Sequence, residues 1–297
     1  MANTDIIMPA EPGSTALPVV RRLQFSDLSD ALRKGVEDFW SMPTHVVFLA
    51  LLYPLAGFIL AGVSYDNDTI QLLYPLASGF ALVGPLAAIW MYELSRRREM
   101  GLDTSWRHAF DVLHSPSLPS IVLIAALLMA LFVLWVASAQ ALYFAAFGLR
   151  KIGTVSELAH LIATTPEGRS LFIYGNLVGL AFATVAASVS VISLPLLLDR
   201  NVGFSAAVAT SLTVVFRNPV AMAAWGVIVA ALLVIGALPF LFGLAIVVPI
   251  LGHATWHLYR RAVEPETAPR PEYAPRRKGI RYAADFPASL FSRWRVD

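Results

Sequence analysis

Long stretches without a single charged residue are the feature that most constrains this chain. Its six longest apolar segments contain none of the 22 Lys and Arg or 20 Asp and Glu residues. A hydrocarbon core about 30 Å thick needs about 20 apolar residues per helix, and each segment meets or approaches that length. The sequence therefore predicts an all-α membrane protein with six transmembrane helices. The expected spans are about residues 44–64, 69–92, 119–148, 171–198, 219–236 and 238–259.

Composition supports the same class. Charged residues make up 14% of the chain, whereas a soluble domain usually contains about 25%. The absence of cysteine excludes disulfides, thiolate metal sites and iron–sulfur clusters. The last two spans run together, so we expect a tight turn from Gly236 to Pro239.

The positive charges predict the orientation. Cytoplasmic loops of membrane proteins carry an excess of Lys and Arg. With six spans, 19 of the 22 Lys and Arg residues fall on the side of the two ends, and only Arg150, Lys151 and Arg169 fall on the other. Both ends are therefore expected in the cytoplasm.

A similar segment precedes each expected pair of spans. Residues 26–40, 103–113 and 205–216 are amphipathic and are followed by Pro43, Pro116 and Pro219. A short amphipathic helix lies in the headgroup layer, and a following proline favours a new helix that turns into the bilayer. The pattern predicts three helical hairpins, each preceded by an interfacial helix, although amphipathic loops between spans are also common. The expected apolar faces are Leu28, Leu32, Val36 and Phe39; Trp106, Phe110 and Leu113; and Val208, Leu212 and Phe216.

These boundaries give three regions. Residues 1–25 are expected to be a disordered cytoplasmic tail, and residues 26–261 the transmembrane domain. Residues 262–297 are a proline-rich, basic cytoplasmic tail, which either stays solvated or binds anionic lipid through Arg276, Arg277, Lys278 and Arg281.

Small residues mark two helix-packing faces. Glycine and alanine at helical spacing let two helices approach closely in lipid. The sequence does not show whether these faces pack within one chain or between copies. The residues are Gly175, Gly179, Ala183 and Ala187 in the fourth span, and Ala223, Gly226 and Ala230 in the fifth.

Three histidines are the candidates for a cofactor site. His253 and His257 share a helix face, and His45 begins the first span at a similar depth. Imidazoles on facing helices can bind haem or a metal, but histidines beside Trp256 and Tyr259 also fit an ordinary interfacial belt. We expect no cofactor and no metal, and keep haem as the alternative.

Other chemistry has little support. No carboxylate or basic group lies at bilayer depth, which argues against proton relays and voltage sensing. The polar residues there suit either contacts between helices or a path for a small solute. They are Gln140, Asn176, Thr184, Ser188 and Ser190. No catalytic, phosphate-binding or nucleic-acid-binding motif is present.

Charged and aromatic residues at the cytoplasmic side are the candidates for contact with a partner or with lipid headgroups. Glu93 is also placed to pair with Arg96 or Arg97 in the same helix. The candidates are Glu93, Arg96, Arg97, Arg98, Trp106, Arg200, Arg260 and Arg261.

The chain resembles a family of uncharacterised bacterial integral membrane proteins, a domain of unknown function, over about residues 26–262. The resemblance implies a bacterial inner membrane and transfers no catalytic residue. Members are sometimes labelled cytochrome oxidase subunits, but such cores need about twice as many spans and histidines at mid-membrane depth. The similarity lies in Asp38-Phe39, His45, Tyr53-Pro54, Gly57, Gly84-Pro85, residues 92–99, 195–200 and 252–257.

The sequence thus predicts a non-enzymatic inner-membrane protein that acts as an accessory, assembly or scaffold component. Its expected partners are membrane lipid and other membrane proteins or further copies of itself, and not nucleic acid. A small-solute or lipid permease and a haem-binding or metal-binding subunit remain as alternatives.

Overall fold

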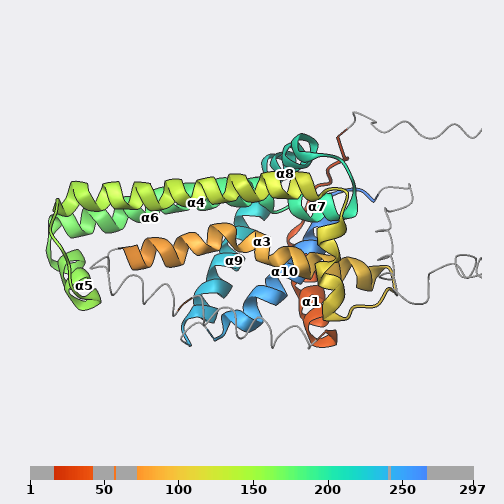
Figure 1. The fold of residues 1–297 in the computed structure, drawn as a ribbon, viewed down its shortest axis with the longest axis horizontal. Helices are drawn as coiled ribbons and strands as arrows, with labels where there is room; N and C mark the ends of the chain where they lie inside the picture. The colour runs from red at the N-terminus through yellow and green to blue at the C-terminus, as the bar shows by residue number, and fades with distance from the viewer. Residues whose placement is uncertain (1–16, 43–56, 58–71, 240–241, 266–297) are drawn as a thin grey trace, which may run out of the picture.

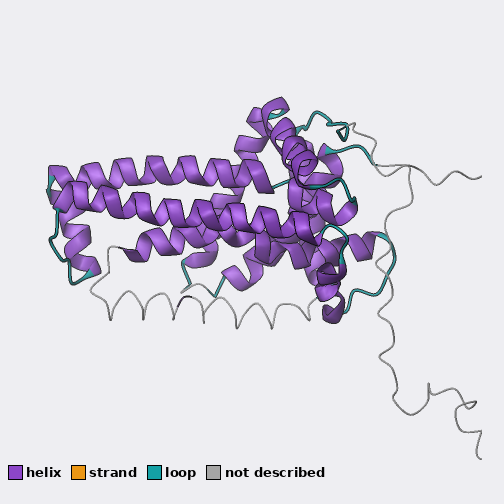
Figure 2. Ribbon diagram, turned by 45° about the horizontal axis from the view of Figure 1, so that its top comes forward, coloured by secondary structure: helices purple, strands orange, loops and turns teal. Residues whose placement is uncertain are grey.

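The computed structural model describes residues 17–42, 57, 72–239 and 242–265, and its described part contains helices without any named strand (Figures 1 and 2). The all-α prediction is confirmed. The helices are α1 (Phe25–Ser41), α3 (Leu73–Glu99), the 3₁₀ helix η2 (Trp106–His114), α4 (Leu118–Phe147), α5 (Val155–Thr164), α6 (Pro166–Ser190), α7 (Ser193–Asp199), α8 (Phe204–Arg217), α9 (Pro219–Ala237) and α10 (Leu244–Ala262).

The helices form an elongated bundle with two different ends. Helices α4 and α6 run side by side along the long axis, and α3 packs against both (Figures 1 and 2). The short helix α5 covers one end, here called the α5 end. Helices α1, α7 and α8 gather at the opposite end, here called the polar end (Figure 1). The bundle therefore separates a long apolar part from a crowded polar end.

Four stretches of helix in the described part are long and apolar enough to cross a membrane: α3, α4, α6 with α7, and α9. They correspond to four of the six expected spans. The first expected span, 44–64, lies outside the described residues except for Gly57. The last expected span, 238–259, is shifted, because α10 begins at Leu244 and is not among these four.

Two expected boundaries are wrong for local reasons. Gly236 lies inside α9, which ends at Ala237, rather than in the turn, which the structure describes at 238–239 and 242–243. The expected fourth span, 171–198, is two helices, because the chain turns at Val191 and Ile192 before α7 begins. The Ser211 hydroxyl accepts from the Ile192 backbone N–H at 3.3 Å, so α8 supports this break.

The three expected interfacial segments are helical, and none of them packs through the whole of its expected apolar face. Helix α1 buries Leu28 and Phe39 of that face together with Gly35, while Val36 is exposed. Helix α8 buries Thr210 and Ser211 while Phe216 is exposed. Segment η2 is a 3₁₀ helix that buries Ala109 and Val112, whose three-residue spacing suits three residues per turn. Trp106 and Leu113 remain exposed there. Each of these helices therefore has one face on the protein and apolar side chains left uncovered.

Candidate functional site

Helix α1 is held against α10 at very short range. A Cβ at Gly35 would lie 2.7 Å from the Ala254 Cβ and N atoms and from the Ile250 carbonyl oxygen. Because these neighbours are mostly backbone atoms, only glycine allows this approach. The contact brings the next turn of α1 and its carboxylate into the protein.

That carboxylate belongs to Asp38, which is buried where α1, α3 and α10 meet. It accepts hydrogen bonds from the Ser95 hydroxyl of α3 and from Arg98 of the same helix. The His257 Nε2 atom lies 2.9 Å from Asp38 Oδ2, and His253 Nδ1 lies 2.7 Å from Ser95 Oγ. These five residues form one connected unit, here called the Asp38 junction.

The surroundings of Asp38 favour its charged form. Burial raises its pKa, but hydrogen bonds from His257 and Ser95 and the positive charge of the histidines outweigh burial, so the pKa lies below the ordinary value. The carboxylate is therefore the acceptor on which the three helices converge. The Ser95 hydroxyl donates its hydrogen bond to this carboxylate, whereas a serine activated by a histidine base donates to the histidine.

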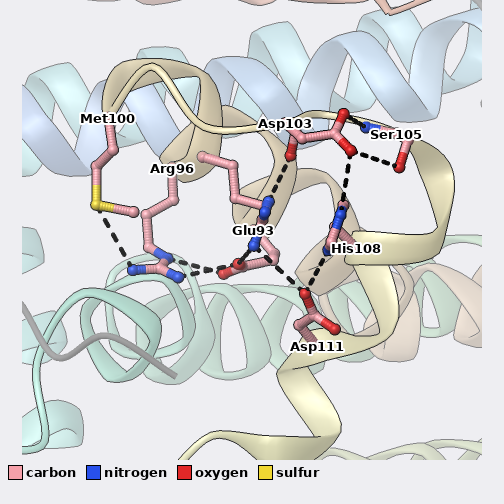
Figure 3. A network of polar contacts seen from close by, with 8 residues as sticks. Glu93, Arg96, Met100, Asp103, Ser105, His108 and Asp111 are labelled. Atoms are coloured by element: carbon pink, nitrogen blue, oxygen red, sulfur yellow. Dashed lines mark hydrogen bonds and ion pairs between the residues drawn. The ribbon is translucent and has the colours of Figure 1, made fainter. Parts of the chain in front are cut away.

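A second network joins α3 to η2 (Figure 3). Arg96 donates two bonds to the Glu93 carboxylate, at 2.8 and 2.9 Å, and both side chains are buried. Arg97 reaches Asp111 Oδ2 at 3.3 Å, and His108 Nδ1 lies 2.7 Å from the same oxygen. The predicted Glu93–Arg96 pair is confirmed. Arg97 contacts both Glu93 and Asp111, and these contacts hold η2 beside the last turns of α3.

A third network joins α3, α7 and α10. Arg260 pairs with Glu99 at 3.0 Å and with Asp199 at 3.2 Å. The Tyr259 hydroxyl donates to Asp199 Oδ2 at 2.6 Å, and the Trp256 indole donates to Glu99 at 3.1 Å. Asp199 and Tyr259 are buried, so the end of α7 is fixed to the last turns of α10 by a charge-assisted contact.

The two segments that flank the bundle meet at the same end. Val20 and Val263 form an isolated antiparallel bridge. The Asn218 side chain, which precedes α9, accepts from the Leu23 N–H at 2.8 Å and donates to the Arg21 carbonyl at 3.1 Å. One amide thus ties the chain before α1 to the junction of α8 and α9.

The candidate contact residues have different surroundings. Glu93, Arg96 and Arg200 are buried; for these three the expected surface role is corrected to pairing inside the protein, because the neighbouring helices cover them. Arg97 and Arg260 are partly covered by the pairs just described. Trp106 is exposed, as are Arg98 and Arg261, so contact with lipid or a partner stays a prediction for them.

The candidate cofactor histidines are engaged inside the protein. His253 Nδ1 faces Ser95, His257 Nε2 faces Asp38, and His45 lies outside the described residues. In the described part of the chain, no group of three or more His, Asp or Glu side chains is placed to hold a metal ion. The two described histidines instead connect α10 to α1 and α3.

The small-residue faces are largely uncovered. In α6, Gly179 lies under the Trp135 ring of α4, with 3.0 Å from a Cβ position to the ring. Around Gly175 and Gly226 no atom lies within 4 Å of such a position. The remaining four small residues are exposed, and they are Ala183, Ala187, Ala223 and Ala230. Of the three predicted packing glycines, Gly179 is therefore the one with a close contact to another helix, and that contact is with a tryptophan ring.

Most of the polar residues predicted at bilayer depth make hydrogen bonds within their own helix or to a neighbouring helix. Asn176 of α6 accepts from the Tyr74 hydroxyl of α3 at 2.9 Å. Thr184 and Ser190 each donate to a carbonyl one turn earlier in their own helix. The Gln140 Oε1 atom is buried and has no hydrogen-bond partner in the described part.

Sequence reasoning gave no role to Asp38, the acceptor on which three helices converge, because it lies outside the expected apolar face of its helix. A signal was present: Leu28, Ala31, Gly35 and Asp38 follow helical spacing, and two of them are small. Such a small-residue face indicates close packing on a helix. The partner helix, however, is more than 200 residues away in the sequence, and no local pattern identifies it.

These features define an integral membrane protein with several apolar helices and a polar end closed by buried charge pairs. Residues 73–199 match the family model described as "Predicted integral membrane protein (DUF2189)", a domain of unknown function. The match covers α3 to α7 and confirms the resemblance over a shorter range than expected. No curated protein and no solved structure matches the chain.

Proposed function

We propose that this is a non-enzymatic scaffold or accessory protein of a bacterial inner membrane, with its polar end in the cytoplasm. The observation that carries the proposal is that α1, η2 and α8 each have one face packed on the bundle and other apolar side chains exposed. The packed faces include small or polar residues such as Gly35, Ala109 and Thr210, and the other apolar side chains are exposed at the polar end. The exposed side chains include Trp40, Trp106, Leu113 and Phe216.

Aromatic and apolar side chains at one end of a membrane bundle suit the headgroup layer or the surface of another membrane protein. The fixed geometry beneath them supports a scaffold, because the Asp38 junction and the other two networks hold five helices in one arrangement. A surface that is ordered before binding loses less entropy when a partner binds.

The proposed orientation follows from charge. The Lys and Arg excess lies at the polar end and in the segments that precede and follow the bundle, and such segments stay in the cytoplasm. Three hairpins with an interfacial helix before each place both ends of the chain on this side.

Affinity purification from native membranes, followed by mass spectrometry, tests the proposal. The bait is the full chain, compared with a variant that carries Trp40→Ser, Trp106→Ser and Phe216→Ser. A matched control carries Glu37→Gln and Ser29→Ala, which change exposed polar residues of α1.

We expect a defined membrane protein that co-purifies with the bait and the control and is lost with the triple variant. Recovery of the bait alone in every detergent would contradict the proposal. An absorption spectrum of the same sample tests whether haem is bound. We expect no Soret band.

A further inference from the structure

The turn between α9 and α10 contains only apolar residues, and large side chains among them are exposed. Residues 219–252 contain no charged residue and no Ser, Thr, Asn, Gln or His, and this range includes the whole turn. Leu238 is 76% exposed and Phe242 is 60% exposed. The loop after α4, in contrast, continues with Arg150 and Lys151. A turn that faced water would leave these apolar side chains hydrated, which is unfavourable.

The described backbone groups of this turn make hydrogen bonds within the turn and its two helices. The Leu238 N–H donates to the Val234 carbonyl at 3.1 Å, and the Phe242 N–H donates to the Pro239 carbonyl at 3.0 Å. The Ala245 N–H donates back to Phe242 at 3.1 Å. Pro239 has no N–H to satisfy. Backbone groups in hydrocarbon must be satisfied within the protein, and these described groups meet that requirement.

Contacts with α3 show how far this turn lies from the α5 end. Leu244, the first residue of α10, packs on Met91, which is only four residues before Ser95 of the Asp38 junction. Beyond Met91, α3 continues for 18 residues to Leu73, or about 27 Å at 1.5 Å per residue. Along the long axis of the bundle, the ends of α9 and α10 at this turn correspondingly lie level with the middle of α4 and α6 and not with α5 (Figures 1 and 2).

The length of α10 agrees with this position. His253 is fixed at the polar end by its contact with Ser95. Nine residues separate Leu244 from His253, a rise of about 14 Å, which is about half of a 30 Å hydrocarbon core. Helix α9 has 19 residues but lies at a steep angle to α4 and α6 (Figure 1), so its length does not carry it across.

We propose that α9 and α10 form a re-entrant hairpin, which enters the bilayer from the polar end, turns inside it and returns. Leu238 and Phe242 contact the acyl chains of the leaflet at the polar end. Of the five expected spans that fall in the described part of the chain, α3, α4 and α6 then cross the bilayer, whereas α9 and α10 do not. A re-entrant hairpin begins and ends on one side, as a pair of crossings does, so the expected side of the two ends of the chain is unchanged. This inference does not depend on the scaffold function.

Single cysteines test the depth directly, because the natural chain has none. Leu238→Cys and Phe242→Cys report on the turn. Arg22→Cys reports on the polar end, and Leu149→Cys, at an 87% exposed position after α4, reports on the α5 end. Each full-length variant is treated with a membrane-impermeant maleimide in sealed vesicles of either orientation, and again after solubilisation in detergent.

We expect labelling of Arg22→Cys from one side and of Leu149→Cys from the other. Leu238→Cys and Phe242→Cys should react from neither side, and all four should react in detergent. A nitroxide attached at position 242 should show an oxygen-to-nickel-chelate accessibility ratio of the bilayer interior. Labelling of Phe242→Cys from the side of Leu149→Cys, or a nitroxide depth at that headgroup layer, would overturn the proposal.

A charge in the turn gives an independent readout. Phe242→Lys places an ammonium group in hydrocarbon, whereas Leu149→Lys places it beside water. We expect the yield of folded protein in membranes to fall by about tenfold or more for Phe242→Lys, given the cost of lysine inside a bilayer, and to change little for Leu149→Lys. Equal yields would count against the re-entrant hairpin.

Discussion

Removal of the Asp38 carboxylate should destabilise the protein more than any change to an exposed charge of α1. Its side chain is 5% exposed and accepts from Ser95, His257 and Arg98. A hydrogen bond to a charged group contributes about 1.5–3 kcal/mol, but Arg98 is 41% exposed, so solvent reduces its share to about 1 kcal/mol or less.

These contributions do not add, and breaking a buried pair by removing one partner costs about 3–5 kcal/mol. We therefore expect Asp38→Ala to lower the free energy of unfolding by about 3–4 kcal/mol. Asp38→Asn keeps the shape and one acceptor oxygen, so a loss of about 1–3 kcal/mol is expected. The matched control is Glu37→Gln, which alters an exposed pair with Arg33 in the same helix and should cost about 0.5 kcal/mol or less.

Equilibrium titration with sodium dodecyl sulfate, followed by intrinsic tryptophan fluorescence, measures these differences in mixed micelles. A double-mutant cycle of Asp38→Asn with His257→Ala should give a coupling free energy of about 1–3 kcal/mol. If Asp38→Ala and Glu37→Gln differ by less than about 1 kcal/mol, the reasoning that the carboxylate organises the three helices is refuted.

Three further predictions follow from the same end of the bundle. Acidification should remove the contribution of Asp38 to the free energy of unfolding. Since the folded-state pKa of Asp38 is lowered, this contribution is complete above the ordinary aspartate pKa of about 3.9 and is lost as the pH falls through the folded-state value. In detergent at pH 5 and below, the wild type should therefore lose stability more steeply than Asp38→Asn; parallel pH profiles would contradict this. Gly35→Ala should cost about 1–3 kcal/mol by overpacking α1 against α10, whereas Gly226→Ala, which has open space around it, should be neutral or stabilising by up to about 1 kcal/mol; equal unfolding midpoints in dodecyl sulfate would refute the close contact. Asn218→Ala removes an amide that bonds to the chain before α1 and should cost about 1–3 kcal/mol, measured by thermal unfolding against Thr213→Ala, whose hydroxyl bonds within α8; a loss no larger than that of the control would show that the tie contributes little.

Patterns local in the sequence predicted the right elements where neighbouring residues decide the structure. The cap of α5 depends on such neighbours, since the Glu157 N–H donates to the hydroxyl of Thr154, three residues earlier. The pair Glu93–Arg96 is likewise within one turn of helix. The helices η2 and α8, which precede α4 and α9, were also predictable, because proline and amphipathic periodicity act over a few residues.

Patterns that depend on distant partners were misread. Glu93 and Arg96 looked like surface charges, yet the neighbouring helices cover them completely. The small residues of α6 and α9 looked like packing faces, yet Gly35 and Gly252, outside both faces, make closer helix contacts, with α10 and α3. Glycine spacing shows that a close approach is possible, but the partner is chosen by the whole arrangement.

By itself the sequence determined the class of this protein. Long apolar segments without charge predict helices that lie in the bilayer, and the Lys and Arg bias predicts the side of the membrane on which each loop lies. Both effects depend only on composition along the chain. Only the tertiary structure decided which helices meet, that Asp38 is the acceptor between α1, α3 and α10, and that α9 and α10 turn level with the middle of the bundle. Hydrophobicity is a property of each segment, whereas close packing and buried charge pairing depend on residues up to 219 positions apart.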